Sequence, residues 1–186
     1  MQPVHRKRLK KLADFLSKFK PSDNRVFDMD TWGHNEIDDI ENSVVKNKTE
    51  NKVEVCTEFK CSTTACALGW AATIPELNKE GLHWESCISS YDIPEVGDQT
   101  WSGIALEGYK NRDEIRIAMR FFGLKASEAV GIFGGSDHYS PSASSEGYEG
   151  ESRDVEPKEV ADRITSLLAG KWTPSAYDKR YARQYR

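Results

Sequence analysis

The sequence predicts a mainly helical fold of the α+β class, in which a single compact domain of about five helices carries one short β element. Three observations support this fold class. Apolar side chains recur at helical spacing in several separate stretches, one short stretch alternates like a strand, and Gly, Pro and Ser gather between them. With 186 residues, a hydrophobic fraction of 38% and a net charge of −4, the chain suits one domain that buries its own core.

The first helix is expected over residues 5–20, and Pro21 ends it. Its apolar side chains follow the spacing of one buried helical face: Leu9, Leu12, Ala13 and Leu16. The helix is also basic, the end of the chain is basic again, and residues 23–58 are acidic. This charge pattern predicts basic ends that fold back on an acidic body, with two arms for a polyanion as the alternative.

A strand-to-helix corner is expected next. Residues 53–60 alternate between apolar and polar side chains, which indicates a short strand. A helix is expected to start at Ser62 or Thr63, whose hydroxyl would cap it, and to run to about Thr73. Gly69 in its interior costs about 1 kcal/mol against Ala, which predicts that another element packs closely there. Residues 76–110 are expected to form ordered loops and short turns.

The C-terminal half predicts three more helices. Two short helices are expected over residues 111–133, joined at Gly123, which is a natural helix stop. Residues 134–154 are rich in Gly, Ser and acidic residues and predict a mobile loop within the domain. A further helix starts with Pro157 and closes the globular domain of residues 1–170. Residues 171–186 are then a basic, aromatic C-terminal tail.

The four cysteines are the first candidates for chemistry: Cys56, Cys61, Cys66 and Cys87. No secretory signal precedes them, which favours free thiols in a reducing cytoplasm. Cys61 would lie just before the helix that starts at Ser62 or Thr63, where backbone N–H groups lower a thiol pKa. A cysteine-dependent hydrolase or transferase would therefore use Cys61, with His83 as its base. The alternative is that both close cysteines are small buried apolar residues.

A metal site is a further alternative, built from Cys61, Cys66, His83 and Cys87. The spacing of the first two is the outer edge of the range that structural zinc sites use. The helix that carries Cys66 has an inward face already committed to packing, so no metal is the expected outcome. No cofactor is expected either, because the sequence holds no phosphate-loop, dinucleotide-binding or kinase motif. No apolar run is long enough to span a bilayer, so no membrane partner is expected.

The tail carries the candidate binding residues. Three tyrosines follow at i, i+4 and i+8, with cations between them and a tryptophan ahead of them: Trp172, Tyr177, Lys179, Arg180, Tyr181, Arg183 and Tyr185. Tyr and Arg are enriched at binding hot spots, and such a stripe can fill a protein groove or stack bases. The alternative is that the aromatic side chains pack back on the domain.

Several motifs resemble those of a group of small proteins encoded by bacteriophage genomes. The resemblance rests on Cys61-x-Thr63-x-x-Cys66-x-x-Gly69-x-Ala71, on Phe122-Gly123-Leu124, and on Pro157-x-x-Val160-Ala161-x-Arg163-Ile164. The group has no assigned activity, so the resemblance implies a context, which is an accessory protein in the cytoplasm of an infected bacterium. We expect a non-enzymatic binding protein with a protein partner, in host takeover or defence inhibition. Nucleic-acid binding through the basic ends is the alternative.

Overall fold

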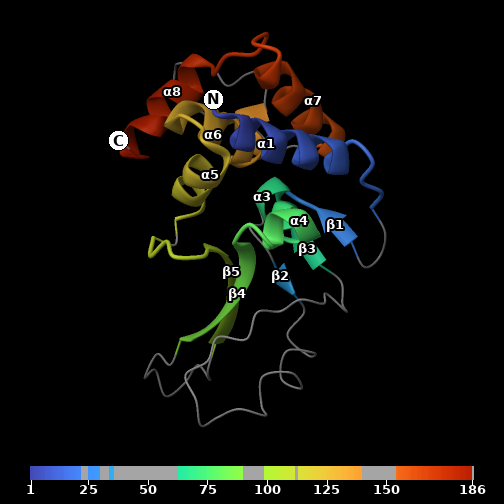
Figure 1. Ribbon diagram of the computed structural model, residues 1–186, viewed down its shortest axis with the longest axis vertical. Coiled ribbons are helices and arrows are strands. Elements are labelled where there is room, and N and C mark those ends of the chain that lie inside the picture. The colour runs from blue at the N-terminus through green and yellow to red at the C-terminus, as the bar shows by residue number, and fades with distance from the viewer. Residues whose placement is uncertain are drawn as a thin grey trace.

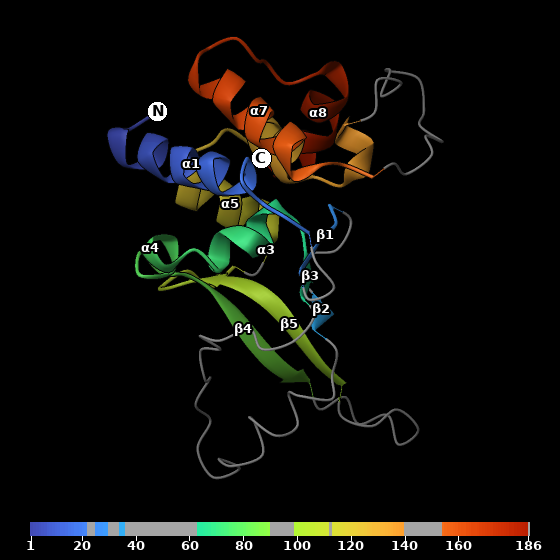
Figure 2. The same cartoon turned by 90° about the vertical axis from the view of Figure 1, so that its right-hand side faces the viewer.

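A helical half and a long β-hairpin that leads away from it make up the arrangement of the chain (Figure 1). The structure is a computed structural model, and it describes residues 1–21, 25–29, 34–35, 63–89, 99–111, 113–139 and 154–185. The helical half contains α1 (Pro3–Leu16), α5 (Glu114–Phe122), α6 (Ala126–Phe133), α7 (Pro157–Leu168) and α8 (Ala176–Tyr181). The short helices α3 (Ala67–Ala72) and α4 (Pro75–Asn78) lie between this half and the hairpin (Figure 2).

The core forms where the predicted helical faces meet. Helix α1 buries the expected face of Leu9, Leu12, Ala13 and Leu16, and it packs against α7 and α5. The rings of Phe122 and Phe133 stack between α5 and α6 with centroids 5.3 Å apart. Removing such apolar surface from water is the main favourable term in folding. The prediction of a mainly helical, single compact domain is confirmed.

Two small sheets supply the β structure. In the first, β3 (Thr63–Ala65) lies between β1 (Arg25–Phe27), which runs parallel to it, and β2 (His34–Asn35), which runs antiparallel. The second is the antiparallel hairpin of β4 (Leu82–Ser89) and β5 (Gln99–Leu106). The prediction of loops and turns for residues 76–110 is therefore wrong for the hairpin. The strand period was present in part, since Leu82, Trp84, Ile104 and Leu106 are buried two residues apart on each strand.

Helix α3 begins later than the sequence predicts. Residues 63–65 pair with β1 as a strand, and Cys66 is the N-cap of a helix that starts at Ala67. A start at Ser62 or Thr63 is thus wrong, because pairing with a strand distant in sequence takes the backbone that a cap would have used. The close packing expected at Gly69 is present, since the indole Nε1 of Trp84 donates to the Gly69 carbonyl at 3.1 Å. The strand predicted over residues 53–60 lies outside the described residues.

The segment after α6 also differs from its prediction. Residues 134–139 were expected to open a mobile loop, yet Ser136–Tyr139 form the 3₁₀ helix η3, and Ser136, His138 and Tyr139 are buried. Contacts with α7 and α8, which lie later in the chain, provide the burial that the local composition does not predict. The rest of the predicted loop, residues 140–153, falls outside the described part of the chain. Across the described residues, no helix combines the length and the apolar character needed to cross a bilayer.

Candidate functional site

The end of the chain packs onto α6 instead of leaving the domain. Helix α8 and the 3₁₀ helix η4 (Ala182–Tyr185) bury Tyr177, Asp178 and Ala182. Gly131 of α6 makes room for them, because a Cβ there would lie 2.8 Å from the Trp172 ring and 3.0 Å from Asp178 Oδ2. The segment predicted as a tail is therefore packed against the helical half.

A buried His–Asp pair holds α8 in this position. Nδ1 of His138 lies 2.8 Å from Oδ1 of Asp178, and the two side chains are 2% and 3% exposed. An ionised carboxylate only accepts hydrogen bonds, so Nδ1 donates. The rings of Tyr177 and Tyr181 lie 4.8 and 5.2 Å from the His138 ring, centroid to centroid. The pair thus joins η3 to α8 across a distance of 40 residues in sequence.

Asp178 also caps its own helix. Its Oδ2 accepts from the Ser175 N–H at 2.8 Å, while Ser175 Oγ accepts from the Asp178 N–H at 3.1 Å. Burial raises the pKa of Asp178, but hydrogen bonds from His138 and Ser175 outweigh it, and the net pKa lies below the ordinary 3.8. The carboxylate therefore stays ionised at neutral pH.

Arg163 ties the same region to α7. Its Nη1 donates to the Gly131 and His138 carbonyls, and the guanidinium lies 3.6 Å from the centre of the Tyr139 ring. A planar guanidinium can donate and stack at once, which suits a residue that links three elements. Gly131, η3 and α7 are consequently held as one unit beneath α8.

The chemistry of the His138–Asp178 pair favours anchoring over catalysis. A carboxylate that fixes a histidine tautomer is the arrangement that also orients general bases in enzymes. Here Nδ1 of His138 is bonded to Asp178, and 2% of the side chain is exposed where the ring borders a pocket that Tyr181 and Tyr185 also line. The sequence assigned His138 to a mobile loop, and that placement is wrong. The Ser175-x-x-Asp178 capping box was the visible signal for an ordered helix at the end of the chain.

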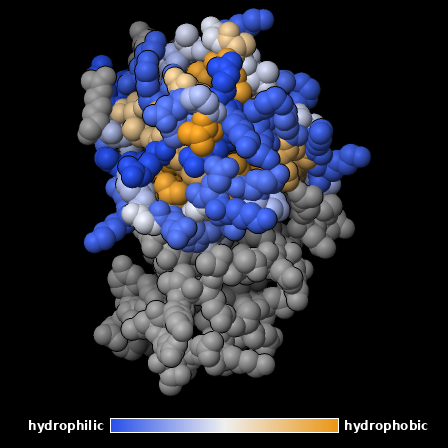
Figure 3. Space-filling view, viewed as in Figure 1, coloured by the Kyte–Doolittle hydropathy of each residue, from blue (hydrophilic) through white to orange (hydrophobic). Residues whose placement is uncertain are grey.

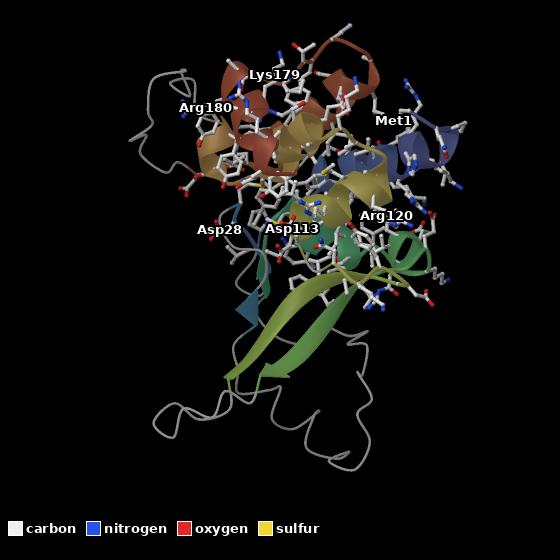
Figure 4. All side chains as sticks on the ribbon, turned by 90° about the vertical axis from the view of Figure 1, so that its left-hand side faces the viewer. Met1, Asp28, Asp113, Arg120, Lys179 and Arg180 are labelled. Atoms are coloured by element: carbon white, nitrogen blue, oxygen red, sulfur yellow. The ribbon has the colours of Figure 1, made fainter. Side chains whose placement is uncertain are left out.

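The outer side of α8 and η4 presents cations and one aromatic ring. Lys179, Arg180 and Arg183 are exposed, and Figure 4 shows Lys179 and Arg180 on α8. Among the described residues, the exposed large hydrophobic side chains are Met1, Val4, Val26 and Tyr181, so Tyr181, at 46%, is the aromatic one. In the view of Figure 3 the surface of the helical half is otherwise mostly hydrophilic, with small separate hydrophobic areas. We call Lys179, Arg180, Tyr181 and Arg183 the α8 face.

A pocket of about 210 Å³ adjoins the α8 face. Its walls are Tyr181 and Tyr185, the apolar side chains of Ile115 and Val130, and the His138 edge beside Gly134 and Gly135. Gly134 is needed for this shape, since a Cβ there would lie 2.5 Å from Cδ2 of His138. Of the predicted binding residues, Tyr181 and Tyr185 line this pocket together, and Lys179, Arg180 and Arg183 are exposed on the same short segment of the chain. The structure buries Tyr177 and half-buries Trp172.

The cysteine hypotheses gain nothing from the structure. Cys61 lies outside the described residues, and the helix expected to activate its thiol begins at Ala67, so that reason for its reactivity is gone. Cys66 does sit at the N-cap of α3, but burial raises its thiol pKa to about 11, against the hydrogen bonds from Gly69 and Leu68 that lower it. Desolvation therefore outweighs the helix terminus, and Cys66 is a core residue.

His83 and the proposed metal ligands are not assembled in the part that is described. Nδ1 of His83 donates to the Gly81 carbonyl at 2.9 Å. That nitrogen is therefore used by a local hydrogen bond at the start of β4. Cys87 is in β4, but its side chain is not among those described. Within the described residues, no group of three or more His, Cys, Asp or Glu side chains is placed to hold a metal ion.

The basic side chains of α1 mostly bind other parts of the same chain. Arg6 donates to the Leu168 carbonyl, and Arg8 bonds to Glu80 and to the Phe121 carbonyl. Lys10 pairs with Asp14, and Lys11 pairs with Glu76. This agrees with a basic end that folds back on the body, and it leaves less of α1 for the polyanion alternative.

Comparison with known proteins adds no relative to this picture. No protein-family model matches the sequence, and neither a curated protein nor a solved structure gives a significant match.

Proposed function

We propose that the protein is a non-enzymatic accessory protein that binds a protein partner through the α8 face. The observation that carries the proposal is the combination of an exposed Tyr181 and exposed cations on a helix that is pinned by Tyr177, Asp178 and Ala182. Tyr and Arg dominate the energetics of protein interfaces. A surface that is already fixed loses little conformational freedom on binding, which favours affinity.

The bacteriophage resemblance supports a partner in the infected bacterial cell, of host or phage origin. Blocking a host defence or redirecting a host protein is the role that fits an accessory protein of this size. The proposed role needs no catalytic group, which agrees with the buried thiol of Cys66 and the nearly inaccessible ring of His138. The internal contacts of the α1 cations favour a protein partner over nucleic acid, because phosphate binding draws on unengaged Lys and Arg side chains.

The test is affinity capture from a bacterial lysate with two charge-matched variants. Lys179→Glu/Arg183→Glu reverses two charges on the α8 face, and Lys7→Glu/Lys18→Glu reverses two exposed charges at the other end of the chain. We expect the wild type and the Lys7/Lys18 variant to recover the same partner, and the α8 variant to recover at least about tenfold less. Equal recovery by all three proteins, or no specific partner for the wild type, would overturn the proposal.

A further inference from the structure

The segment of residues 172–185, which we call the C-terminal segment, is fixed to the domain by few side chains. Of its residues, all of which the structure describes, Tyr177, Asp178 and Ala182 are buried. Among the described residues, α8 and η4 lie mainly against α6 and against each other. Regions with few buried apolar contacts open at a lower free energy than the core of the same protein. We therefore expect the C-terminal segment to open more often than the core of the domain.

One carboxylate joins this segment to the domain and also shapes its helix. Oδ1 of Asp178 accepts from Nδ1 of His138 at 2.8 Å, and Oδ2 accepts from the Ser175 N–H at 2.8 Å. Helix α8 has six residues, whereas isolated helices shorter than about 12 residues are marginal in water. Docking on His138 and folding of α8 therefore depend on each other.

His138 also contacts the exposed tyrosine of the α8 face. Its ring lies 5.2 Å from the Tyr181 ring at an angle of 82°, and the Tyr181 ring lies 6.2 Å from that of Tyr177. Tyr181 is 46% exposed, so these two rings support the inner side of a side chain that also faces water. His138 is in turn held by the body of the domain, because its carbonyl accepts from Arg163 of α7. The position of Tyr181 is thus set through His138.

On the basis of the protein-binding role proposed above, we infer that residues 172–185 dock and fold as one unit, and that His138 is the positioning residue of the α8 face. When the segment leaves α6, α8 unfolds and the residues of the α8 face no longer share a helix. The rest of the helical half keeps its fold, because α1, α5, α6 and α7 pack on one another. An order–disorder change of a segment is an established form of switch. Binding requires the docked state, so the apparent affinity falls in proportion to the docked fraction.

Native-state hydrogen exchange of the full chain in low urea tests docking as one unit. The reporters are the amides of Asp178, Lys179 and Ala182, which bond to Ser175 Oγ, the Ser175 carbonyl and the Asp178 carbonyl. We expect these amides to share one opening free energy, with a weaker urea dependence than amides inside α1, because a small unit exposes less surface. Graded protection along the segment, or the urea dependence of α1, would overturn the inference.

A matched pair of substitutions at His138 separates its donor from its shape. His138→Asn retains an N–H donor at about the position of Nδ1, whereas His138→Leu has a similar branched shape and no donor. We expect the segment amides to exchange at least about tenfold faster in the Leu variant than in the Asn variant, as for a lost hydrogen bond to a charged group. Asp178→Asn, which removes the charge from the other partner, should also speed their exchange. Equal exchange in the two His138 variants would show that His138 does not position the segment.

A block at Gly131 tests the link between docking and binding without changing the α8 face. A Cβ at Gly131 would lie 2.8 Å from Trp172 and 3.0 Å from Asp178, so Gly131→Leu fills the place of the segment from the α6 side. Leu is also a better helix former than Gly, which favours an intact α6. We expect the segment amides to lose protection, the α1 amide signals to keep their wild-type positions, and partner capture from the lysate to fall at least about tenfold.

The two proposals fail in different ways. If the segment exchanges as one unit but Gly131→Leu captures the partner as well as the wild type does, the docking unit stands and its control of binding is wrong. If the wild type captures no specific partner, the protein-binding role and its control by docking are wrong, while hydrogen exchange still decides the docking unit. If capture depends on Lys179 and Arg183 but the segment shows graded exchange, the binding role stands and the docking unit is wrong.

Discussion

The two basic ends of the chain use their charge in opposite ways. At the first helix, Arg6, Arg8 and Lys11 bind carbonyls or carboxylates of distant segments. At the last helix, the buried side chains of Asp178 and Tyr177 fix the segment, and Lys179 and Arg183 lie exposed. Similar composition thus gives a helix whose charges stabilise the fold and a helix whose charges face outward.

The difference follows from how each helix is fixed to the body. Helix α1 has a full apolar face and lies along α7, and its Arg8 reaches the carbonyl of Phe121 near the end of α5. Helix α8 is too short for such a face, and it is held by the burial of Tyr177 and Asp178 against α6 and by the bond of Asp178 to His138. Figures 2 and 4 place Met1 and α8 on opposite sides of the helical half. The side chains that fix α8 are buried, and Lys179, Tyr181 and Arg183 remain exposed.

The largest expected effect comes from removing the anchor of α8. Asp178→Ala leaves the His138 ring buried without its carboxylate and also removes the acceptor of the Ser175 N–H, which is half of the capping box of α8. Breaking a buried pair in this way costs about 3–5 kcal/mol of unfolding free energy. Asp14→Ala breaks an exposed pair on α1 and should cost about 0–1 kcal/mol. Urea denaturation of both variants checks the contrast, and an Asp178 variant as stable as the Asp14 variant would contradict the anchoring role.

The close packing of the α8 segment against Gly131 gives the next largest expected effect on stability. In an open helix, Gly→Ala stabilises by about 1 kcal/mol. At Gly131 the new methyl group would meet Trp172 and Asp178, so Gly131→Ala should destabilise by about 1–3 kcal/mol. Gly103→Ala is the control, because no atom of the described residues lies within 4 Å of a Cβ at that position. A stabilised Gly131 variant in thermal unfolding would show that α8 does not pack as described.

The sequence predicts the helices well because their signals are local. The apolar stripe of α1, the Asp113 cap, the Gly123 stop and Pro157 at the first turn of α7 all depend on residues within a few positions. The hairpin and β3 are different, because each strand depends on a partner outside its own local pattern, 10 to 24 residues away in the hairpin and 38 residues away for β1 and β3. The later start of α3 has the same origin, because its first expected turn is used in a sheet.

The exposed residues of the site can be predicted from the sequence, whereas the buried His138–Asp178 pair cannot. The cations and Tyr181 follow from the composition of the last residues, and they are exposed in the structure. No local pattern links His138 to Asp178, because a Gly- and Ser-rich stretch and α7 separate them. The sequence therefore predicts a separate tail, although the His138–Asp178 pair and the packing of Tyr177 and Ala182 on α6 make the segment part of the domain.

Cations on the two ends should differ in their effect on stability. Arg8 is partly buried, stacks 4.1 Å over Phe121 and bonds to Glu80, so Arg8→Ala should lower the unfolding free energy by about 1–2 kcal/mol. The double variant Lys179→Ala/Arg183→Ala should stay within about 0.5 kcal/mol of the wild type, as expected for exposed residues. Denaturant titrations measure both. A costly α8 variant would mean that its cations also serve the fold.

The smallest effect is expected from acid, and it isolates the charge of Asp178 from its shape. The pKa of Asp178 is lower in the folded chain than the ordinary 3.8, so its contribution is complete above that pH and is lost as the pH falls towards the folded value. Asp178→Asn keeps the size but does not titrate. The stability gap between the wild type and Asp178→Asn should therefore narrow as the pH drops below 3.8. Urea titrations between pH 6 and pH 3 measure the gap, with Asp14→Asn as the control, and a gap that is constant with pH would show that the charge of Asp178 does not hold α8 in place.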